Sequence, residues 1–212
     1  HVAASRGNVR IIEALYYAGA DLGKQNSEGN TPAHNAAHND HAKVITALHH
    51  ADADLSKQNN MGHIPARIAV DKNHEKSLLA LIKASAELDV PSNNEGLTLA
   101  HYAAIRGYEE IISALHRAGI DLNKKNEQEE ASAHYAARNN QASVIAALHQ
   151  AGANLNLQNN HKETPAHYAA RNNHVRVITA LHHAGADLSV QNEKRETPAH
   201  LAVQGNHMEM IN

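Results

Sequence analysis

Apolar and polar positions along the chain follow a pattern that predicts pairs of short helices, and residues 31–63 show it clearly. Thr31 can cap a helix with its hydroxyl, and Pro32 suits the first helical position. Three alanines at helical spacing follow, which predicts a narrow apolar stripe. The pattern stops at Asn39 and Asp40, so the first helix of this segment is expected to be short.

A second helix is predicted from about Ala42 to Ala51, because Val44, Ile45 and Leu48 share one helical face. Both helices are too short to be stable alone in water, so their order must come from packing on neighbouring segments. The polar, asparagine-rich stretch over residues 53–63 predicts a turn or hairpin that projects from the helices.

The same pattern returns along the chain every 33 or 34 residues. The helix start TPAH, or a variant of it, occurs at Thr31, Ile64, Thr98, Ala131, Thr164 and Thr197. The residue types that best tolerate the left-handed backbone recur at the predicted ends of the first helices: Gly7, Asn73, Gly107, Asn140, Asn173 and Asn206. Self-similarity at a fixed period of this length predicts a repeat architecture.

Helix, turn, helix and projecting hairpin at this period resemble the ankyrin repeat, whose signature is T-P-L-H-x-A. TPAHNAA, TPAHYAA and TPAHLAV carry the resemblance, together with AGADL or a close variant at Ala18, Ala118, Ala151 and Ala184. It covers essentially the whole chain. The resemblance implies an all-α solenoid of stacked helix-turn-helix units with projecting β-hairpin loops.

We expect one ankyrin-repeat domain over residues 1–212, with units at approximately 1–30, 31–63, 64–97, 98–130, 131–163, 164–196 and 197–212. Both ends cut across a repeat, so this sequence is expected to be part of a longer chain. The third unit departs most from the pattern. There Ile64 replaces the capping threonine, Arg67 replaces the histidine, and the stretch from Val90 has an extra residue and a proline.

Composition narrows the classes of function. The formal net charge of −3 is too close to neutral for a chain whose main task is to grip a nucleic-acid backbone. No apolar run approaches the roughly 18 residues of a membrane span, and no signal peptide precedes His1, which predicts a cytoplasmic protein. No phosphate loop, zincin motif or catalytic triad is evident, so we expect no enzyme activity and no cofactor. A monomer is expected.

The 19 histidines invite a metal-binding or catalytic interpretation, but their spacing argues against it. The first histidine column ends each TPAH motif, and the ankyrin resemblance implies a structural role for it: His1, His34, His101, His134, His167 and His200. The second column lies in the second helices, at the predicted edge of the buried face: His49, His116, His149 and His182. If the second column were partly buried and neutral, stability would fall on acidification. Of all groupings only His34, His38 and His41 have helical spacing, and we expect no metal site there.

The ankyrin resemblance implies that partners contact the hairpin tips and two residues near the end of each first helix, on the concave side. The candidate helix-end residues are Arg6, His38, Asn39, Lys72, Arg106, Arg138, Asn139, Arg171 and Asn172, and the candidate tip residues are His161 and Glu163. Five of the seven helix ends carry a basic residue, which suggests a basic stripe beside acidic tips. An ordinary solvated face would have the same composition.

The leading interpretation is a non-enzymatic protein–protein interaction scaffold, with an acidic extended or helical segment as its partner. In that case, replacing Arg106, Arg138 and Arg171 together should weaken partner binding without lowering stability. An alternative is the substrate-targeting arm of a larger enzyme or of a host-directed microbial effector, acting in the host-cell cytoplasm. Nucleic-acid binding by the basic stripe would show a steep loss of affinity with salt, and a histidine-based metal sensor would show a metal-dependent melting temperature.

Overall fold

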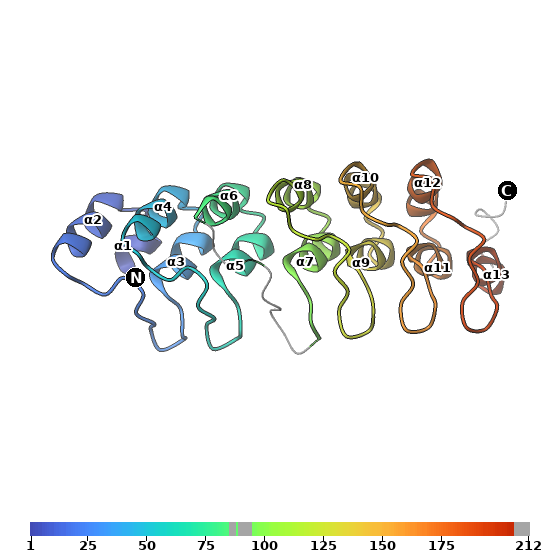
Figure 1. The fold of residues 1–212 in the computed structure, drawn as a ribbon, viewed down its shortest axis with the longest axis horizontal. Helices are drawn as coiled ribbons and strands as arrows, with labels where there is room; N and C mark the ends of the chain where they lie inside the picture. Colours follow the sequence, from blue (N-terminus) through green and yellow to red (C-terminus); the bar gives the residue numbers. More distant parts are fainter. Residues whose placement is uncertain (85–87, 89–94, 206–212) are drawn as a thin grey trace. The chain divides into compact units, whose positions relative to one another are not determined.

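The computed structural model describes residues 1–84, 88 and 95–205, and it divides the chain into two compact units, His1–Asn94 and Glu95–Asn212. The first unit contains α1 (Val2–Ser5), α2 (Val9–Tyr17), α3 (Pro32–His38), α4 (Ala42–His50), α5 (Pro65–Asp71) and α6 (Glu75–Lys83) (Figure 1). The second contains α7 (Leu99–Arg106), α8 (Glu109–Arg117), α9 (Ser132–Arg138), α10 (Ala142–Gln150), α11 (Pro165–Arg171), α12 (Val175–His183) and α13 (Pro198–Gln204). No strand occurs in the described residues, and the predicted all-α fold class is confirmed.

The helices begin and end where the sequence predicts. In residues 31–63, α3 starts at Pro32 after an extended Thr31, and α4 covers the predicted second helix. The predicted left-handed positions are confirmed by positive φ angles: Gly7 71°, Asp40 56°, Asn73 56°, Gly107 80°, Asn140 58° and Asn173 57°. Asn206 and the proline-containing stretch from Val90 lie outside the described residues.

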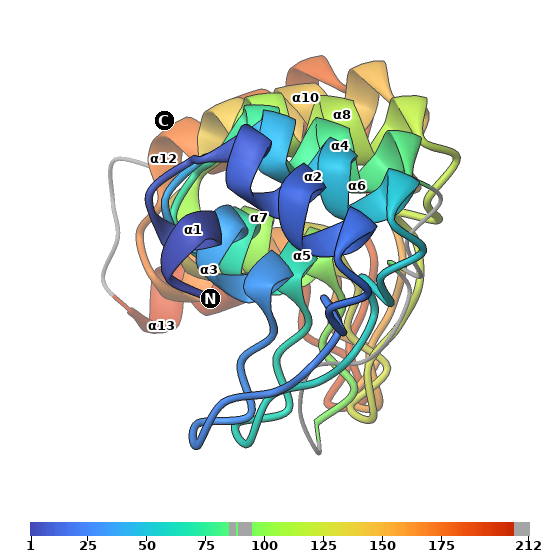
Figure 2. The same cartoon turned by 90° about the vertical axis from the view of Figure 1, so that its left-hand side faces the viewer.

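Each compact unit has two layers of helices. In the first unit, α1, α3 and α5 pack side by side, as do α2, α4 and α6. In the second unit, α7, α9, α11 and α13 form one layer, and α8, α10 and α12 form the other. The loops that precede the first helices extend from the first-helix layer (Figures 1 and 2). Backbone hydrogen bonds join neighbouring loop tips, as from the Glu127 N–H to the Glu95 carbonyl and from the Glu193 N–H to the His161 carbonyl.

The core is built from small and aliphatic side chains. Most of the fully buried residues of the second helices are large, and Ile45, Leu48, Ile145 and Leu148 have no exposed surface. The first helices contribute paired alanines such as Ala136 and Ala137, which are also fully buried. Because alanine has only a methyl group, first helices with this sequence can lie close together, and the chain fills its core without phenylalanine or tryptophan.

The first histidine column links each first helix to the next loop. In the second unit, the Nδ1 of His167 accepts hydrogen bonds from the backbone N–H of Thr164 at 3.0 Å and contacts its hydroxyl at 2.9 Å. The opposite nitrogen, Nε2, donates to the carbonyl of Glu196, 29 residues further along. His1, His34, His101 and His134 make the equivalent Nε2 bond. Because Nδ1 accepts and Nε2 donates, the neutral imidazole satisfies both partners.

Two repeats replace part of this motif. In the third repeat, over residues 64–97, Ile64 has no hydroxyl and α5 still starts at Pro65. The buried Arg67 takes the place of the histidine and donates from Nε to Asp71 at 2.9 Å. In the fifth repeat, over residues 131–163, the backbone N–H of Ala131 still donates to His134 Nδ1 at 3.1 Å. The histidine bond therefore persists when the threonine hydroxyl is lost.

The second histidine column is exposed, and the hypothesis that it is partly buried is wrong. His49, His116, His149 and His182 all lie on solvent-facing positions of the second helices. The reason is that each follows the inward leucine by one residue, which turns it by about 100° away from the core. Burial affects the first column instead, where it lowers the pKa of His34, His101 and His167 and lowers the pKa of His134 to about 4.

This burial predicts that the chain loses stability on acidification. A histidine with a lowered folded pKa stays neutral in the folded state while the unfolded chain takes up a proton below about pH 6.5. Its stabilising contribution is therefore complete above pH 6.5 and falls as the pH drops toward the folded value. From His134 alone, the loss between pH 6.5 and pH 5 should be roughly 2 kcal/mol. Urea unfolding at several pH values measures this loss of unfolding free energy.

The exposed His149 provides the matched control for this pH dependence. His149→Gln should follow the wild-type slope of stability against pH, whereas His134→Gln should have a shallower slope because it lacks the buried imidazole. Equal slopes for wild type and His134→Gln would show that protonation of this residue does not govern acid stability.

A buried leucine of the second helices tests the packing of the core. Leu148 in α10 has no exposed surface, so Leu148→Ala should lower the free energy of unfolding by about 2–5 kcal/mol. Thr179→Ala on the exposed side of α12 should change it by less than about 0.5 kcal/mol. Urea denaturation of both variants gives the comparison, and a loss below about 1 kcal/mol for Leu148→Ala would contradict the packing described.

Candidate partner-binding face

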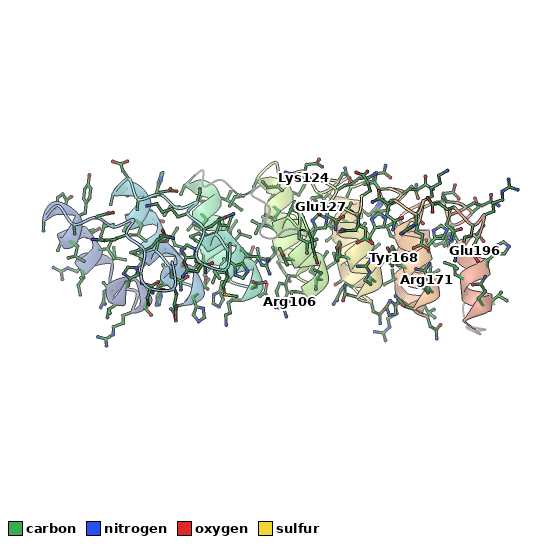
Figure 3. All side chains as sticks on the ribbon, turned by 90° about the horizontal axis from the view of Figure 1, so that it is seen from below. Arg106, Lys124, Glu127, Tyr168, Arg171 and Glu196 are labelled. Atoms are coloured by element: carbon green, nitrogen blue, oxygen red, sulfur yellow. The ribbon has the colours of Figure 1, made fainter. Side chains whose placement is uncertain are left out.

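In the second unit, charged and aromatic side chains of the first helices meet the ends of the loops. We call the set Glu130, Tyr135, Arg138, Glu163, Tyr168 and Arg171 the ladder. The two glutamates end their loops, and the tyrosines and arginines lie on α9 and α11. Figure 3 labels Tyr168 and Arg171 on α11, with Glu196 on the adjoining loop. The ladder therefore lies where the sequence predicted partner contacts, between first-helix ends and loop tips.

Glu130 is the most buried charge of the ladder. Its side chain is only 5% exposed, and one of its carboxylate oxygens accepts hydrogen bonds from the Arg138 guanidinium and from the Tyr168 hydroxyl. A carboxylate so far from water needs partners of this kind, because an unpaired buried charge is strongly destabilising. Arg138 and Tyr168 come from different repeats, so Glu130 ties α11 to the loop that precedes α9.

The arginine of this cluster is enclosed by two aromatic rings. The guanidinium carbon of Arg138 lies 5.0 Å from the ring centre of Tyr135 and 4.5 Å from that of Tyr168. Both distances are within the range of cation–π attraction. The rings are held in turn by hydrogen bonds from Asn126 to the Tyr135 hydroxyl at 2.8 Å and from Asn159 to the Tyr168 hydroxyl at 2.9 Å. The side chains of the cluster are therefore fixed before any partner arrives.

The same arrangement recurs one repeat later. Arg171 pairs with Glu163, which is 10% exposed, and one of the two N–H···O contacts is 3.2 Å long. The guanidinium carbon of Arg171 lies 5.7 Å from the ring centre of Tyr168. Tyr168 thus stands between Arg138 and Arg171 and belongs to both clusters.

The pKa values of the ladder follow from burial and pairing. Burial, and then the charge of Glu130 and hydrogen bonding to it, raise the pKa of Tyr135 and Tyr168 to about 12, so both phenols stay protonated and can donate. Burial opposes the charge on Arg138, but Glu130 and the phenols outweigh it and raise its pKa. Burial raises the pKa of Glu163, but hydrogen bonds from Arg171 outweigh that effect and the pKa is lowered. A carboxylate held ionised in this way fixes geometry and is a poor proton donor.

These pairs change the interpretation of the predicted basic stripe. Arg138 and Arg171 were expected to face a partner, and Glu163 was expected at an exposed tip. In the structure the arginines bind glutamates of their own chain, and Glu163 is buried. Replacing the arginines would strand buried carboxylates, so the expectation that stability would be unaffected does not hold for them.

The remaining basic candidates lie one residue further along their helices. Arg6, Lys72 and Arg106 are exposed and occupy the position of Asn139 in its own repeat. Figure 3 labels Arg106 at the end of α7. The basic candidates therefore form two sets. The inward set, Arg138 and Arg171, pairs with glutamates although the Arg171 side chain is 43% exposed, and the outward set is Arg6, Lys72 and Arg106.

The other candidate residues are distributed over both units. His38 and Asn172 are exposed at the ends of α3 and α11. Asn139 bonds the carbonyl of Tyr135 at 2.8 Å, and Asn39 bonds that of Asn35 at 2.8 Å, so both close the end of their own helix. His161 is exposed at its tip, with Nδ1 3.5 Å from a carboxylate oxygen of Glu193.

Sequence reasoning missed the two tyrosines, although a signal for them exists. Glutamate, tyrosine and arginine occur at positions i, i+5 and i+8 in two consecutive repeats, as 130, 135, 138 and as 163, 168, 171. This spacing crosses from loop to helix and matches neither helix nor strand periodicity. Only alignment of whole repeats would have isolated it.

Two hollows open beside the ladder. One has a volume of about 460 Å³ and is lined by Tyr135, Arg138, Tyr168 and residues of three loop tips, including His161. The other has a volume of about 380 Å³ and is lined by Glu163, Arg171, Leu201, Gln204, the tip residue His161 and residues of the loop over 192–196. The two hollows occupy equivalent places in consecutive repeats and define the ladder face.

No helix among the described residues is both long enough and apolar enough to cross a membrane. In the same residues, no group of three or more histidine, aspartate or glutamate side chains is placed to hold a metal ion. His34 and His41, two of the three histidines considered for a metal, use ring nitrogens for backbone carbonyls of His63 and Ser5.

Removal of the Arg138 guanidinium should destabilise the chain. Arg138→Ala leaves the buried Glu130 carboxylate without its cation, and since Arg138 itself is partly exposed we expect a loss of about 1–3 kcal/mol. Adding Glu130→Gln should recover part of the loss, because the remaining amide carries no charge. Arg106→Ala, at an exposed position, is the control and should change stability by less than about 0.5 kcal/mol. Equal urea midpoints for wild type, Arg138→Ala and Arg106→Ala would contradict a structural role for the Glu130–Arg138 pair.

The comparisons with known proteins agree with the repeat pattern. The family model described as ankyrin repeats (3 copies) matches residues 1–92, 48–126, 82–159 and 133–212. The crystal structure of the ankyrin repeat domain of Bcl-3, described as a unique member of the IkappaB protein family, is 25% identical over 95% of this chain and 92% of that chain, with a TM-score of 0.86. The human ASB11 ankyrin repeat domain is 22% identical over 95% and 90%, with a TM-score of 0.79, a likeness of fold. Comparison with curated proteins finds no match. Because the family model covers the sequence from end to end, the chain belongs to the ankyrin repeat family.

Proposed function

We propose that this chain is a non-enzymatic scaffold that binds a partner protein through the ladder face of its second unit. Ankyrin repeats are generic protein–protein interaction modules, and the family assignment supports this class of function. The finer proposal concerns the face: the ends of α9, α11 and α13 together with the loop tips beside them.

The observation that carries the proposal is the fixed Arg–Tyr cluster at the edge of an open hollow. Tyrosine and arginine are the residue types that contribute most to binding energy at protein interfaces. Arg138 and Tyr168 are half-buried, held by Glu130 and Asn159, and line the hollow of about 460 Å³. Side chains already held in one conformation lose little entropy when a partner binds, which favours affinity.

The preferred partner is an acidic extended or helical segment, and the outward basic residues support this choice. A carboxylate of the partner would have to compete with Glu130 and Glu163 for the inward arginines. Arg106, in the second unit, is exposed, and a partner carboxylate could bind it without displacing a glutamate of the chain. Arg6 and Lys72 occupy the same repeat position in the first unit. An exposed charge of this kind acts mainly on the rate of association and on its salt dependence.

Arg106 provides a direct test of the acidic partner. The probe is a fluorescein-labelled extended peptide with glutamate at every third residue, since three extended residues span about 10 Å, the distance between packed helices. Arg106→Gln should weaken binding about three- to tenfold at low salt, with an unchanged melting temperature. Fluorescence anisotropy at two salt concentrations measures the effect.

Arg176→Gln is the matched control for this experiment. Arg176 is exposed on α12, a second helix away from the ladder face, and the substitution removes the same charge. Equal weakening by both variants would mean that the peptide responds to net charge alone, and the proposed face would be rejected.

A further inference from the structure

The pattern of the ladder does not continue into the next repeat, which contains α13. Glu130 receives Arg138 from its own repeat and the Tyr168 hydroxyl from the next one. Glu163 receives Arg171 from its own repeat, but the residue of the next repeat that corresponds to Tyr168 is Leu201. The Glu163–Arg171 pair therefore occupies the place of the Glu130–Arg138 pair, but Arg171 bonds both carboxylate oxygens, the Asn192 side chain also bonds this carboxylate, and no phenol follows.

The hydrogen bonds around Leu201 adjust to the missing hydroxyl. Asn126 and Asn159 donate to tyrosine hydroxyls, whereas the equivalent Asn192 donates to Glu196 at 3.1 Å. Gln204 stands where the earlier repeats have arginine, and its amide also donates to Glu196, at 2.8 Å. Leu201 is short and packs inward against Ala170 and Ala202, so it does not reach Glu163 as Tyr168 reaches Glu130.

The space beside Leu201 is open, as is the equivalent hollow of about 460 Å³ that Tyr168 lines one repeat earlier. Glu163, Arg171 and Leu201 all line the hollow of about 380 Å³, which is large enough for a phenol ring with part of the chain that carries it. Its rim is polar, with His161, Glu193 and Lys194 on the loop tips. A ring that entered from solvent would meet a guanidinium and a carboxylate at the base of the hollow, as Tyr168 does one repeat earlier.

We propose that this hollow binds a tyrosine side chain of the partner protein, whose ring stacks on Arg171 and whose hydroxyl donates to Glu163. The packing of Tyr168 against Arg138 and Glu130 supplies the geometry: a ring centre about 4.5 Å from the guanidinium and a direct hydroxyl–carboxylate bond. Phenylalanine would supply the ring without the donor, and a basic side chain would be repelled by Arg171. This inference rests on the proposed function, since it names the partner side chain taken by the ladder face.

The test uses N-acetyl-tyrosinamide as the probe and the full chain as the receptor. The probe should shift the ¹H–¹⁵N resonances of the Arg171 Nε–H and of the Glu163 and Leu201 amides in a saturable way. N-acetyl-phenylalaninamide should bind about tenfold more weakly, because it cannot donate a hydrogen bond to the carboxylate. Equal binding of the two probes would overturn the proposal, as would preferential binding of N-acetyl-argininamide at these resonances.

Two substitutions of Leu201 separate occupancy of the hollow from loss of folding. Leu201→Tyr supplies the missing phenol from the chain itself and should reduce probe affinity at least tenfold, whereas Leu201→Met provides no ring and should keep it. Retained binding by Leu201→Tyr would overturn the proposal. Failure of the probe together with a normal effect of Arg106→Gln on the acidic peptide would reject this inference alone and leave the proposed function intact.

Discussion

The hydrogen bonds of the first histidine column are the constraint on which the rest of the structure depends. Helices of seven to nine residues are not stable alone, so each repeat must be joined to its neighbour. A neutral imidazole does this by accepting from the start of its own helix and donating to the end of the next loop, as His134 does with Ala131 and Glu163. These bonds fix the position of each loop relative to the first helix of the preceding repeat. They also fix the place of the last residue of that loop.

The ladder follows from this geometry. The carbonyls bonded by His101 and His134 belong to Glu130 and Glu163, so the histidine that orders each loop also positions the glutamate side chain over the next first helix. The rings of His134 and Tyr168 meet edge to face, with centres 6.0 Å apart. Backbone order, aromatic packing and the buried ion pairs are therefore parts of one network. Acidification that protonates the histidines would disturb the ladder face as well as the fold.

The fold was largely predictable from sequence, because its signals are local and repeated. Thr31 and Pro32 fix a helix start, Gly107 and Asn140 fix helix ends through their left-handed backbone, and the period supplies the arrangement of neighbours. The single domain expected over residues 1–212 remains a prediction, because the structure groups residues 1–94 and 95–212 into separate compact units.

The site was only partly predictable. Helix-end residues such as Arg138 and Arg171 were found from their place in the repeat, but whether an arginine faces solvent or a buried glutamate depends on contacts eight residues apart across a loop. The exposure of His149 was missed for a similar reason, because one residue of helical rotation separates it from the buried Leu148. Burial at the edge of a helix face is decided by packing between repeats, which a single repeat does not display.

Hydrogen–deuterium exchange with and without a purified partner shows directly which surface the partner covers. Binding at the ladder face should slow exchange in the loops around residues 127–130, 159–163 and 192–196 and at the ends of α9, α11 and α13, while α8, α10 and α12 are unchanged. Slowed exchange confined to the second helices, with the ladder face unaffected, would contradict it.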